Sequence, residues 1–130
     1  MKIGITGYTG KMGQALLNEI KNNSNDIKIA ALHSRAAINQ FIDGIDITND
    51  YSNLVRKSDI VIDFSRPEES LEVIRHCLAE NKAIVCGTTG FNNTQMNEII
   101  EASKYIKIFY ASNMSLGIAI LSDIVQRTNM

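Results

Sequence analysis

The chain has 130 residues, of which 45% are hydrophobic and 21% are charged, and its formal net charge is -1. A chain of this length can build one ordinary domain with a true core, and we predict a single domain over residues 1–130. The nearly balanced charge favours neither nucleic acid nor an anionic membrane, and no apolar stretch approaches the ~20 residues that span a bilayer. We therefore expect no nucleic-acid partner and no membrane partner.

Short apolar runs alternate with amphipathic stretches along the chain. Buried strands are predicted at residues 2–6, 27–32, 59–64, 83–86 and 106–111, with a further short strand around residues 45–48. Helices are predicted at roughly 11–21, 51–57, 67–80, 94–104 and from 115 onward. This alternation predicts an α/β fold: a Rossmann-like, doubly wound, mainly parallel sheet with helices on both faces.

The N-terminus and the cysteines indicate the compartment. Met1 leads directly into strand-like residues, without the charged region, apolar region and cleavage site of a secretory signal. We therefore expect a cytoplasmic protein in which Cys77 and Cys86 remain thiols. Cys77 continues the apolar stripe of a predicted helix and is interpreted as a core residue, whereas Cys86 is either a core residue or a contact to a bound ligand.

The segment GYTGKMG, residues 7–13, joins the first predicted strand to the first predicted helix. Gly7 suits a tight turn, Gly10 the close approach of a phosphate, and Gly13 a close contact between helix and sheet. The unpaired N–H groups and the dipole of the helix attract an anion at this point. The spacing is one step from the dinucleotide fingerprint, and a Walker A loop is excluded because its Lys-Ser/Thr pair is missing. We predict a pyrophosphate site, the alternative being an ordinary glycine turn.

The run His33-Ser34-Arg35 follows the second predicted strand, about 20 residues after the glycine turn, at the position that reads the ribose in dinucleotide folds. NADH-binding folds usually place a carboxylate there, whereas cations and hydroxyls meet the 2′-phosphate of NADPH. Arg35 can pair with that phosphate, Ser34 can donate its hydroxyl, and Lys11 adds charge from the glycine turn. The run predicts NADPH in preference to NADH, the alternative being a solvated polar turn.

The helix predicted at 67–80 has a marked beginning. Ser65 and Glu68 have the spacing of a capping box, and Pro67 suits a first helical turn. A buried stripe is expected at Leu71, Ile74 and Leu78.

Two further loops follow predicted strands, CGTTGF at 86–91 and ASNMSLG at 111–117. Gly87, Thr88 and Thr89 offer an unhindered backbone and two hydroxyls, and Asn113 offers an amide that can bond a carboxamide such as that of nicotinamide. Parallel strands bring these loops to the edge where open α/β sheets bind ligands. Spacing alone leaves each loop as either a ligand site or a turn or helix cap.

Four stretches, GYTGKMG, DFSRPE, CGTTGF and ASNMSLG, occur in this order and at these intervals. Together they resemble the cofactor-binding domain of the 4-hydroxy-tetrahydrodipicolinate (dihydrodipicolinate) reductases of bacterial lysine and diaminopimelate biosynthesis, over about residues 1–124. The resemblance implies reduction of a small cyclic dicarboxylate by NADH or NADPH. Two competing hypotheses are a related Rossmann reductase of amino-acid metabolism, which the GTTGF run disfavours, and a stand-alone nucleotide-binding module without catalysis.

Carried over by position, the resemblance implies four groups of cofactor contacts. The pyrophosphate would be held by Gly7, Tyr8, Thr9, Gly10, Lys11 and Met12, with Gly13 completing the turn. The adenosine ribose would contact His33, Ser34 and Arg35, the nicotinamide ribose Gly87, Thr88 and Thr89, and the nicotinamide Ala111, Ser112, Asn113 and Met114. Thr89 is also expected to touch the substrate. Many family members carry an acidic residue followed by Arg where this chain has His33-Ser34.

The catalytic residues of the family are expected outside this chain. Family members continue into a substrate domain with a histidine-rich segment and a general-acid histidine, which neither His33 nor His76 matches. We therefore expect no catalytic residue here, a longer enzyme of which this is the front part, and a homotetramer only through the missing domain. Two distant histidines and two cysteines form no ligand cluster, so we expect no metal site. The apolar face of the last predicted helix, Leu116, Ile120, Leu121, Ile124 and Val125, needs a partner surface.

Overall fold

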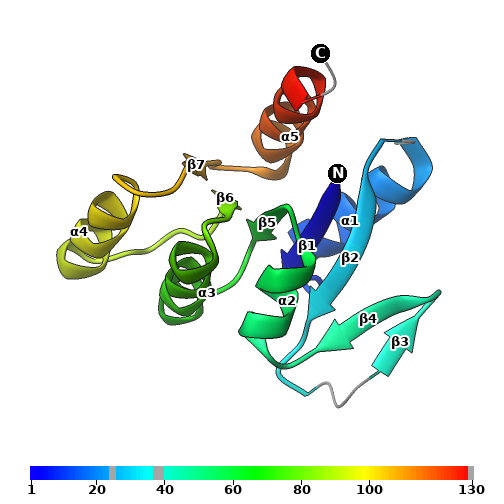
Figure 1. The fold of residues 1–130 in the computed structure, drawn as a ribbon, viewed down its shortest axis with the longest axis horizontal. Helices are drawn as coiled ribbons and strands as arrows, with labels where there is room; N and C mark the ends of the chain where they lie inside the picture. Colours follow the sequence, from blue (N-terminus) through cyan, green and yellow to red (C-terminus); the bar gives the residue numbers. More distant parts are fainter. Residues whose placement is uncertain (24–25, 37–39, 129–130) are drawn as a thin grey trace.

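The structure is a computed structural model that describes residues 1–23, 26–36 and 40–128. Within these ranges, seven strands form one sheet between helices (Figure 1). The strands are β1 (Lys2–Thr6), β2 (Lys28–His33), β3 (Gln40–Ile42), β4 (Ile45–Thr48), β5 (Ile60–Asp63), β6 (Ala83–Cys86) and β7 (Ile108–Tyr110). The helices are α1 (Lys11–Asn23), α2 (Tyr51–Lys57), α3 (Pro67–Glu80), α4 (Asn93–Ala102) and α5 (Met114–Thr128).

The sheet has the strand order β3-β4-β2-β1-β5-β6-β7. All neighbouring strands are parallel except β3 and β4, which form an antiparallel hairpin at the edge. From β1 the chain moves outward through β2 and β4, returns to β5 and continues through β6 and β7 in the other direction. The Rossmann-like, doubly wound prediction is confirmed. The direction reverses between β1 and β5, so their carboxyl ends flank the crevice where open α/β sheets bind ligands.

Apolar cores lie on both faces of the sheet. On one face α1 and α5 pack against it, with Leu16 and Leu121 almost fully buried. On the other face α2, α3 and α4 bury Leu54, Ile74 and Ile99 (Figure 1). Each such side chain contributes about 1.5–3 kcal/mol relative to exposure. Both faces of the sheet are therefore covered by helices, and the loops at its carboxyl edge are left to form a site.

The beginning of α3 differs from the prediction. Pro67 is the first helical residue as expected, but the N-cap is Arg66, which makes no side-chain cap bond. Ser65 lies one residue further out, and its Oγ donates to Asp63 Oδ1 over 2.6 Å. The predicted Ser65–Glu68 capping box is therefore wrong, because a buried carboxylate takes the serine hydroxyl.

The buried stripe of α3 is also shifted from the predicted one. Leu71, Ile74 and Cys77 are buried as expected, but Leu78 is 39% exposed. Val73 is fully buried instead. The buried face of α3 therefore includes Val73 and Cys77 together with Leu71 and Ile74, and Leu78 lies at its edge.

The apolar face of α5 finds most of its partner surface inside the domain. Leu121 and Val125 are buried, and Ile120 and Ile124 pack against the core that α1 shares. Leu116 remains 41% exposed. No helix in the described ranges is both long and apolar enough to cross a bilayer.

Both cysteines are expected to be chemically inert in the folded protein. Cys77 and Cys86 are fully buried thiols, and burial raises the pKa of each to about 12. Because the thiolate is the reactive form, iodoacetamide at about pH 8 should modify neither residue in the native protein and both in denaturant. Mass spectrometry after each reaction checks this, and rapid labelling of either thiol in the native protein would contradict the buried placement.

Candidate functional site

Three loops meet at the carboxyl ends of β1, β5 and β6. A hollow of about 270 Å³ is lined by all three, with Gly10 and Met12 from the glycine turn, Ser65 from the loop after β5, and Thr89 from the loop after β6. A second hollow, of about 490 Å³, is lined by the same glycine turn, the loop after β5 and the end of β2. The two hollows share Gly7, Gly10, Phe64 and Ser65. They therefore adjoin at the crevice between β1 and β5, and together we call them the groove.

The structure gives a different reason for glycine at each of the three positions of the turn. Gly7 has a φ of 66°, and a Cβ there would collide with the carbonyl oxygen of Phe64. A Cβ at Gly13 would collide with the backbone of Gly7 and Tyr8, so α1 lies directly against the turn. A Cβ at Gly10 would meet only the Gly7 carbonyl oxygen, at an ordinary 3.6 Å. The backbone does not require glycine at position 10, and the space beside it opens into the groove.

The carboxylate of Asp63 joins the loops that line the groove. It lies fully buried at the end of β5, opposite Thr6 of β1. Five side chains donate to its oxygens: Thr6, Ser65 (2.6 Å), Ser70, Cys86 (3.7 Å) and Thr88 (3.1 Å). These donors compensate the loss of water around the charge, and they come from β1, α3, β6 and the two loops between them. We call this set the Asp63 network.

The hydroxyl of Thr88 belongs to the network rather than to the groove. Thr88 is 3% exposed, and its Oγ1 accepts from the Ser65 amide over 2.9 Å while it donates to Asp63. The expectation that this hydroxyl is offered to a ligand is therefore wrong. Tyr110 donates its hydroxyl to the Thr88 carbonyl over 2.7 Å and fixes the loop from β7. Thr89, which is exposed at the groove, is the loop hydroxyl that remains for a ligand.

The end of β2 presents a buried imidazole to the groove. His33 is 6% exposed and stacks on Tyr51 with ring centroids 3.9 Å apart. Burial is the largest effect and lowers the pKa of His33. The hydrogen bond with the Asn49 backbone and the Glu69 carboxylate raise this pKa, but by less than burial lowers it. Burial also raises the pKa of Tyr51 to about 12, with a further contribution from Glu69. Both rings are neutral at physiological pH, so Arg35 provides the positive charge of the His33-Ser34-Arg35 run.

Arg35 is already paired in the structure. Its guanidinium forms an ion pair with the carboxylate of Glu69, in the first turn of α3. The Arg35 side chain is 69% exposed and that of Glu69 16% exposed, and both residues line the larger hollow. Because the Arg35 side chain is exposed, its guanidinium is accessible to another anion, which would compete with Glu69 for it.

The loop after β7 contains a helix cap. Asn113 Oδ1 accepts from the Leu116 amide over 2.9 Å at the beginning of α5. This bond uses the amide oxygen and leaves the amide nitrogen as the group that can donate to a ligand. Ala111 is fully buried, Ser112 is exposed, and Met114 lies outside the residues whose side chains the structure describes.

Most of the predicted cofactor residues lie together at the groove. Those that line it are Gly7, Thr9, Gly10, Lys11, Met12, Gly13, His33, Ser34, Arg35, Gly87, Thr88 and Thr89. Tyr8 instead packs against the core, and Ala111, Ser112 and Asn113 lie beyond the lining at the end of β7. No group of three or more metal-ligating side chains is found in the described ranges.

Five residues that line the groove were not predicted as site residues from the sequence: Ala36, Phe64, Ser65, Arg66 and Glu69. Phe64 lines both hollows, and its ring lies so close to Gly87 that a Cβ there would collide with it. Phe64 ends the predicted strand 59–64, and Ser65 and Arg66 follow it directly, at the edge of a parallel sheet where ligands bind, so their position already indicated a site.

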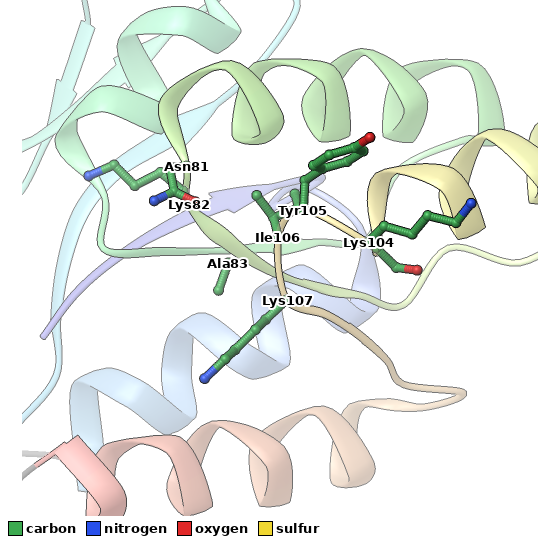
Figure 2. A pocket seen from close by; sticks show the side chains of 8 residues that line it. Asn81, Lys82, Ala83, Lys104, Tyr105, Ile106 and Lys107 are labelled. Carbon is green, nitrogen blue, oxygen red and sulfur yellow. The ribbon is translucent and has the colours of Figure 1, made fainter.

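A separate cavity of about 400 Å³ lies beside Ala83, at the amino end of β6 and so at the opposite edge of the sheet (Figure 2). Its lining includes Lys82, Lys104 and Lys107. Figure 2 shows these three side chains extending in different directions. The cavity therefore does not gather its cations around one anion, and it is not part of the groove.

Comparison with known sequences identifies the family. Residues 1–114 match the family model described as "Dihydrodipicolinate reductase, N-terminus". The chain belongs to the dihydrodipicolinate reductase family. The 4-hydroxy-tetrahydrodipicolinate reductase of Aliarcobacter butzleri is 38% identical over 129 residues, which cover 96% of this chain and 49% of the relative. That of Sulfurovum sp. is 37% identical over 129 residues, with 98% and 50% covered. The chain spans about half the length of these relatives of the dihydrodipicolinate reductase family.

Solved structures share the fold. A dipicolinate-bound dihydrodipicolinate reductase from Paenisporosarcina sp. TG-14 has a TM-score of 0.67 at 24% identity, covering 79% of this chain and 43% of that one. A homoserine dehydrogenase from S. aureus has a TM-score of 0.69 at 14% identity, covering 85% and 31%. At these identities the likeness concerns the fold alone, and the family assignment rests on the sequence matches.

Removing the Asp63 carboxylate should destabilise the domain strongly. Asp63→Ala leaves five side-chain donors, four of them on buried residues, without their acceptor, so we expect the free energy of unfolding to fall by about 3–5 kcal/mol. Asp123→Ala removes an exposed carboxylate paired with Arg127 and should change it by less than about 1 kcal/mol. Urea unfolding of both variants measures the difference. Similar losses in the two variants would contradict the central position of Asp63.

Proposed function

We propose that this chain is the NAD(P)H-binding domain of a 4-hydroxy-tetrahydrodipicolinate reductase. The reaction is the reduction of 4-hydroxy-tetrahydrodipicolinate to tetrahydrodipicolinate in diaminopimelate and lysine biosynthesis. The observation that carries the proposal is the groove between β1 and β5, where the glycine turn, the end of β2 and the Gly87–Thr89 loop line two adjoining hollows. Support comes also from the family match over residues 1–114 and from relatives that bear the name of this reductase.

The residues of the groove fit a dinucleotide. The open space beside Gly10 admits a group close to the backbone, and the first turn of α1 directs unpaired N–H groups toward it. Gly10, Lys11 and Met12 would hold the pyrophosphate, while Ser34 and Arg35 would meet the adenosine ribose. When bound, the nicotinamide cofactor supplies the hydride.

Thr89 at the groove and Asn113 in the loop after β7 would orient the bound molecule. Thr89 would donate to the nicotinamide ribose and touch the substrate, and the amide nitrogen of Asn113 would donate to the nicotinamide carboxamide. The Asp63 network holds the loop that carries Thr89 in a fixed relation to β1 and to the loop after β5. Preorganised donors of this kind reduce the ordering that binding requires.

We place the groups that complete the reaction in the half of the relatives that this chain does not span. Those groups would bind the cyclic dicarboxylate, donate the proton and assemble a homotetramer in the cytoplasm. A stand-alone nucleotide-binding module without catalysis is the second candidate. Both candidates require the groove to bind a dinucleotide.

Blocking the open space at Gly10 tests the proposal. Gly10→Val places a branched side chain where the pyrophosphate would lie, so NADPH affinity should fall by about a hundredfold or more, or about 2.7 kcal/mol. Gly10 directly precedes α1 and its carbonyl accepts from the Gln14 amide, so it is the N-cap of the helix. Val is a poorer N-cap than Gly, and the apo domain should lose only about 1 kcal/mol. Asn18→Val, at an exposed position of α1, is the matched control and should leave affinity unchanged. Calorimetric titration and thermal unfolding give both quantities, and unchanged affinity in Gly10→Val would refute a phosphate site at the turn.

We further propose that NADPH binds more tightly than NADH, because Arg35 can pair with the 2′-phosphate. A bond to a charged group contributes about 1.5–3 kcal/mol, so Arg35→Ala should weaken NADPH by about tenfold to a hundredfold and leave NADH almost unchanged. The preference should also shrink as salt rises, because exposed charges are screened.

Arg75→Ala is the matched control for Arg35→Ala, since Arg75 is an exposed arginine paired with Glu98 and lies outside the lining of the groove. It should change neither affinity. Titrations of both cofactors at two salt concentrations make the comparison. Equal losses for NADH and NADPH in Arg35→Ala would show that Arg35 does not read the phosphate.

A further inference from the structure

Glu69 brings a carboxylate to the ribose end of the groove from a different strand-loop unit. It lies in the first turn of α3, after β5, and lines the same hollow as His33, Ser34 and Arg35. Folds that bind NADH usually carry a carboxylate at the end of β2, where it accepts from the ribose 2′-hydroxyl. This chain has none in the run His33-Ser34-Arg35. α3 therefore supplies the kind of group that the end of β2 lacks.

The ion pair with Arg35 makes this carboxylate a competitor of the 2′-phosphate. A phosphate that pairs with Arg35 must displace Glu69 or lie beside its negative charge, and like charges at short range repel. A 2′-hydroxyl, in contrast, can donate to Glu69 while the ion pair stays intact. The same pair thus opposes one cofactor and accommodates the other.

The surroundings keep Glu69 in this position. Its side chain is only 16% exposed, and the neutral His33 ring lines the same hollow without adding a cation that would neutralise it. Arg66 also lines the hollow, but Arg35 is the residue whose guanidinium contacts Glu69. Arg35, Arg66 and Glu69 are therefore the charged residues that line this hollow, and Arg35 and Glu69 are the two that form an ion pair.

We propose that Glu69 is a specificity-determining residue that accepts from the ribose of NADH, competes with the 2′-phosphate of NADPH for Arg35, and so moderates the preference for NADPH. This inference rests on the proposed function, because it takes the groove to be a dinucleotide site. The Arg35–Glu69 pair then sets the ratio of the two affinities, and the domain accepts both cofactors.

Two small probes isolate this end of the groove. Adenosine 2′,5′-bisphosphate and AMP differ only in the 2′-phosphate. Glu69→Gln should tighten the bisphosphate and weaken AMP, each by about three- to tenfold, so that the affinity ratio rises by about tenfold or more. NADPH and NADH should follow the same direction. Glu68→Gln, an exposed residue of the same helical turn outside the lining of the groove, removes the same charge from the helix N-terminus and should leave the ratio within about twofold.

Repeating the substitution in the Arg35→Ala variant separates competition for Arg35 from the simple loss of a negative charge at position 69. Arg35→Ala removes the guanidinium that Glu69 contacts, so in this variant Glu69→Gln should tighten the bisphosphate clearly less than it does beside Arg35. An equal gain in both backgrounds would overturn the competition. Glu69→Ser, which suits a first helical turn, must raise the ratio in the same direction and covers the case in which Glu69→Gln folds poorly.

The failures of the two proposals are distinguishable. Saturable binding of both cofactors to the wild-type chain, with an unchanged ratio in Glu69→Gln and Glu69→Ser, overturns the role of Glu69 alone. Equal shifts for both probes do the same. Failure of the wild-type chain to bind either cofactor overturns the proposed function, and the inference falls with it.

Discussion

The buried carboxylate of Asp63 is the interaction on which the groove depends. It lies opposite Thr6 at the point where the sheet reverses direction, and it is bonded to Ser65, Ser70 and Thr88 from the other walls. A buried charge that loses its donors is costly, so these segments cannot separate independently. The glycine turn, the beginning of α3 and the loop after β6 are therefore held as one frame. Only the outward groups of that frame are left for a ligand.

Local sequence patterns predicted the fold where local forces decide it. Buried strands and amphipathic helices followed from periodicity because both cores lie against the sheet faces that those patterns mark. The hairpin of β3 and β4 was only half predicted, because β3 has three residues and pairs with a single strand. Its turn carried a signal nonetheless: Asp43-Gly44, with φ of 51° and 81°, is the dipeptide favoured in tight hairpins.

The site was predictable where it is made of backbone and unpredictable where it depends on distant partners. The glycine turn and the end of β2 could be recognised from their spacing. The roles predicted for the Ser65 and Thr88 hydroxyls were wrong because both hydroxyls donate to Asp63, which is distant from Thr88 in the sequence. The contrast with α4 makes the reason plain. There Asn92 and Gln95 form a reciprocal capping box at an exposed helix end, where no buried charge competes for the side chain. A polar side chain therefore caps the nearby helix end unless a buried acceptor from a distant part of the chain binds it more strongly.

Hydrogen–deuterium exchange with and without NADPH reports where on the chain the cofactor orders the backbone, and so tests whether the groove is a dinucleotide site. If NADPH binds in the groove, exchange should slow in peptides covering residues 7–13, 33–36 and 87–89 on saturation with NADPH, with little change at the amino end of β6. Protection confined to the cavity around Lys82, Lys104 and Lys107, or no change in exchange anywhere, would contradict a dinucleotide site at the crevice between β1 and β5.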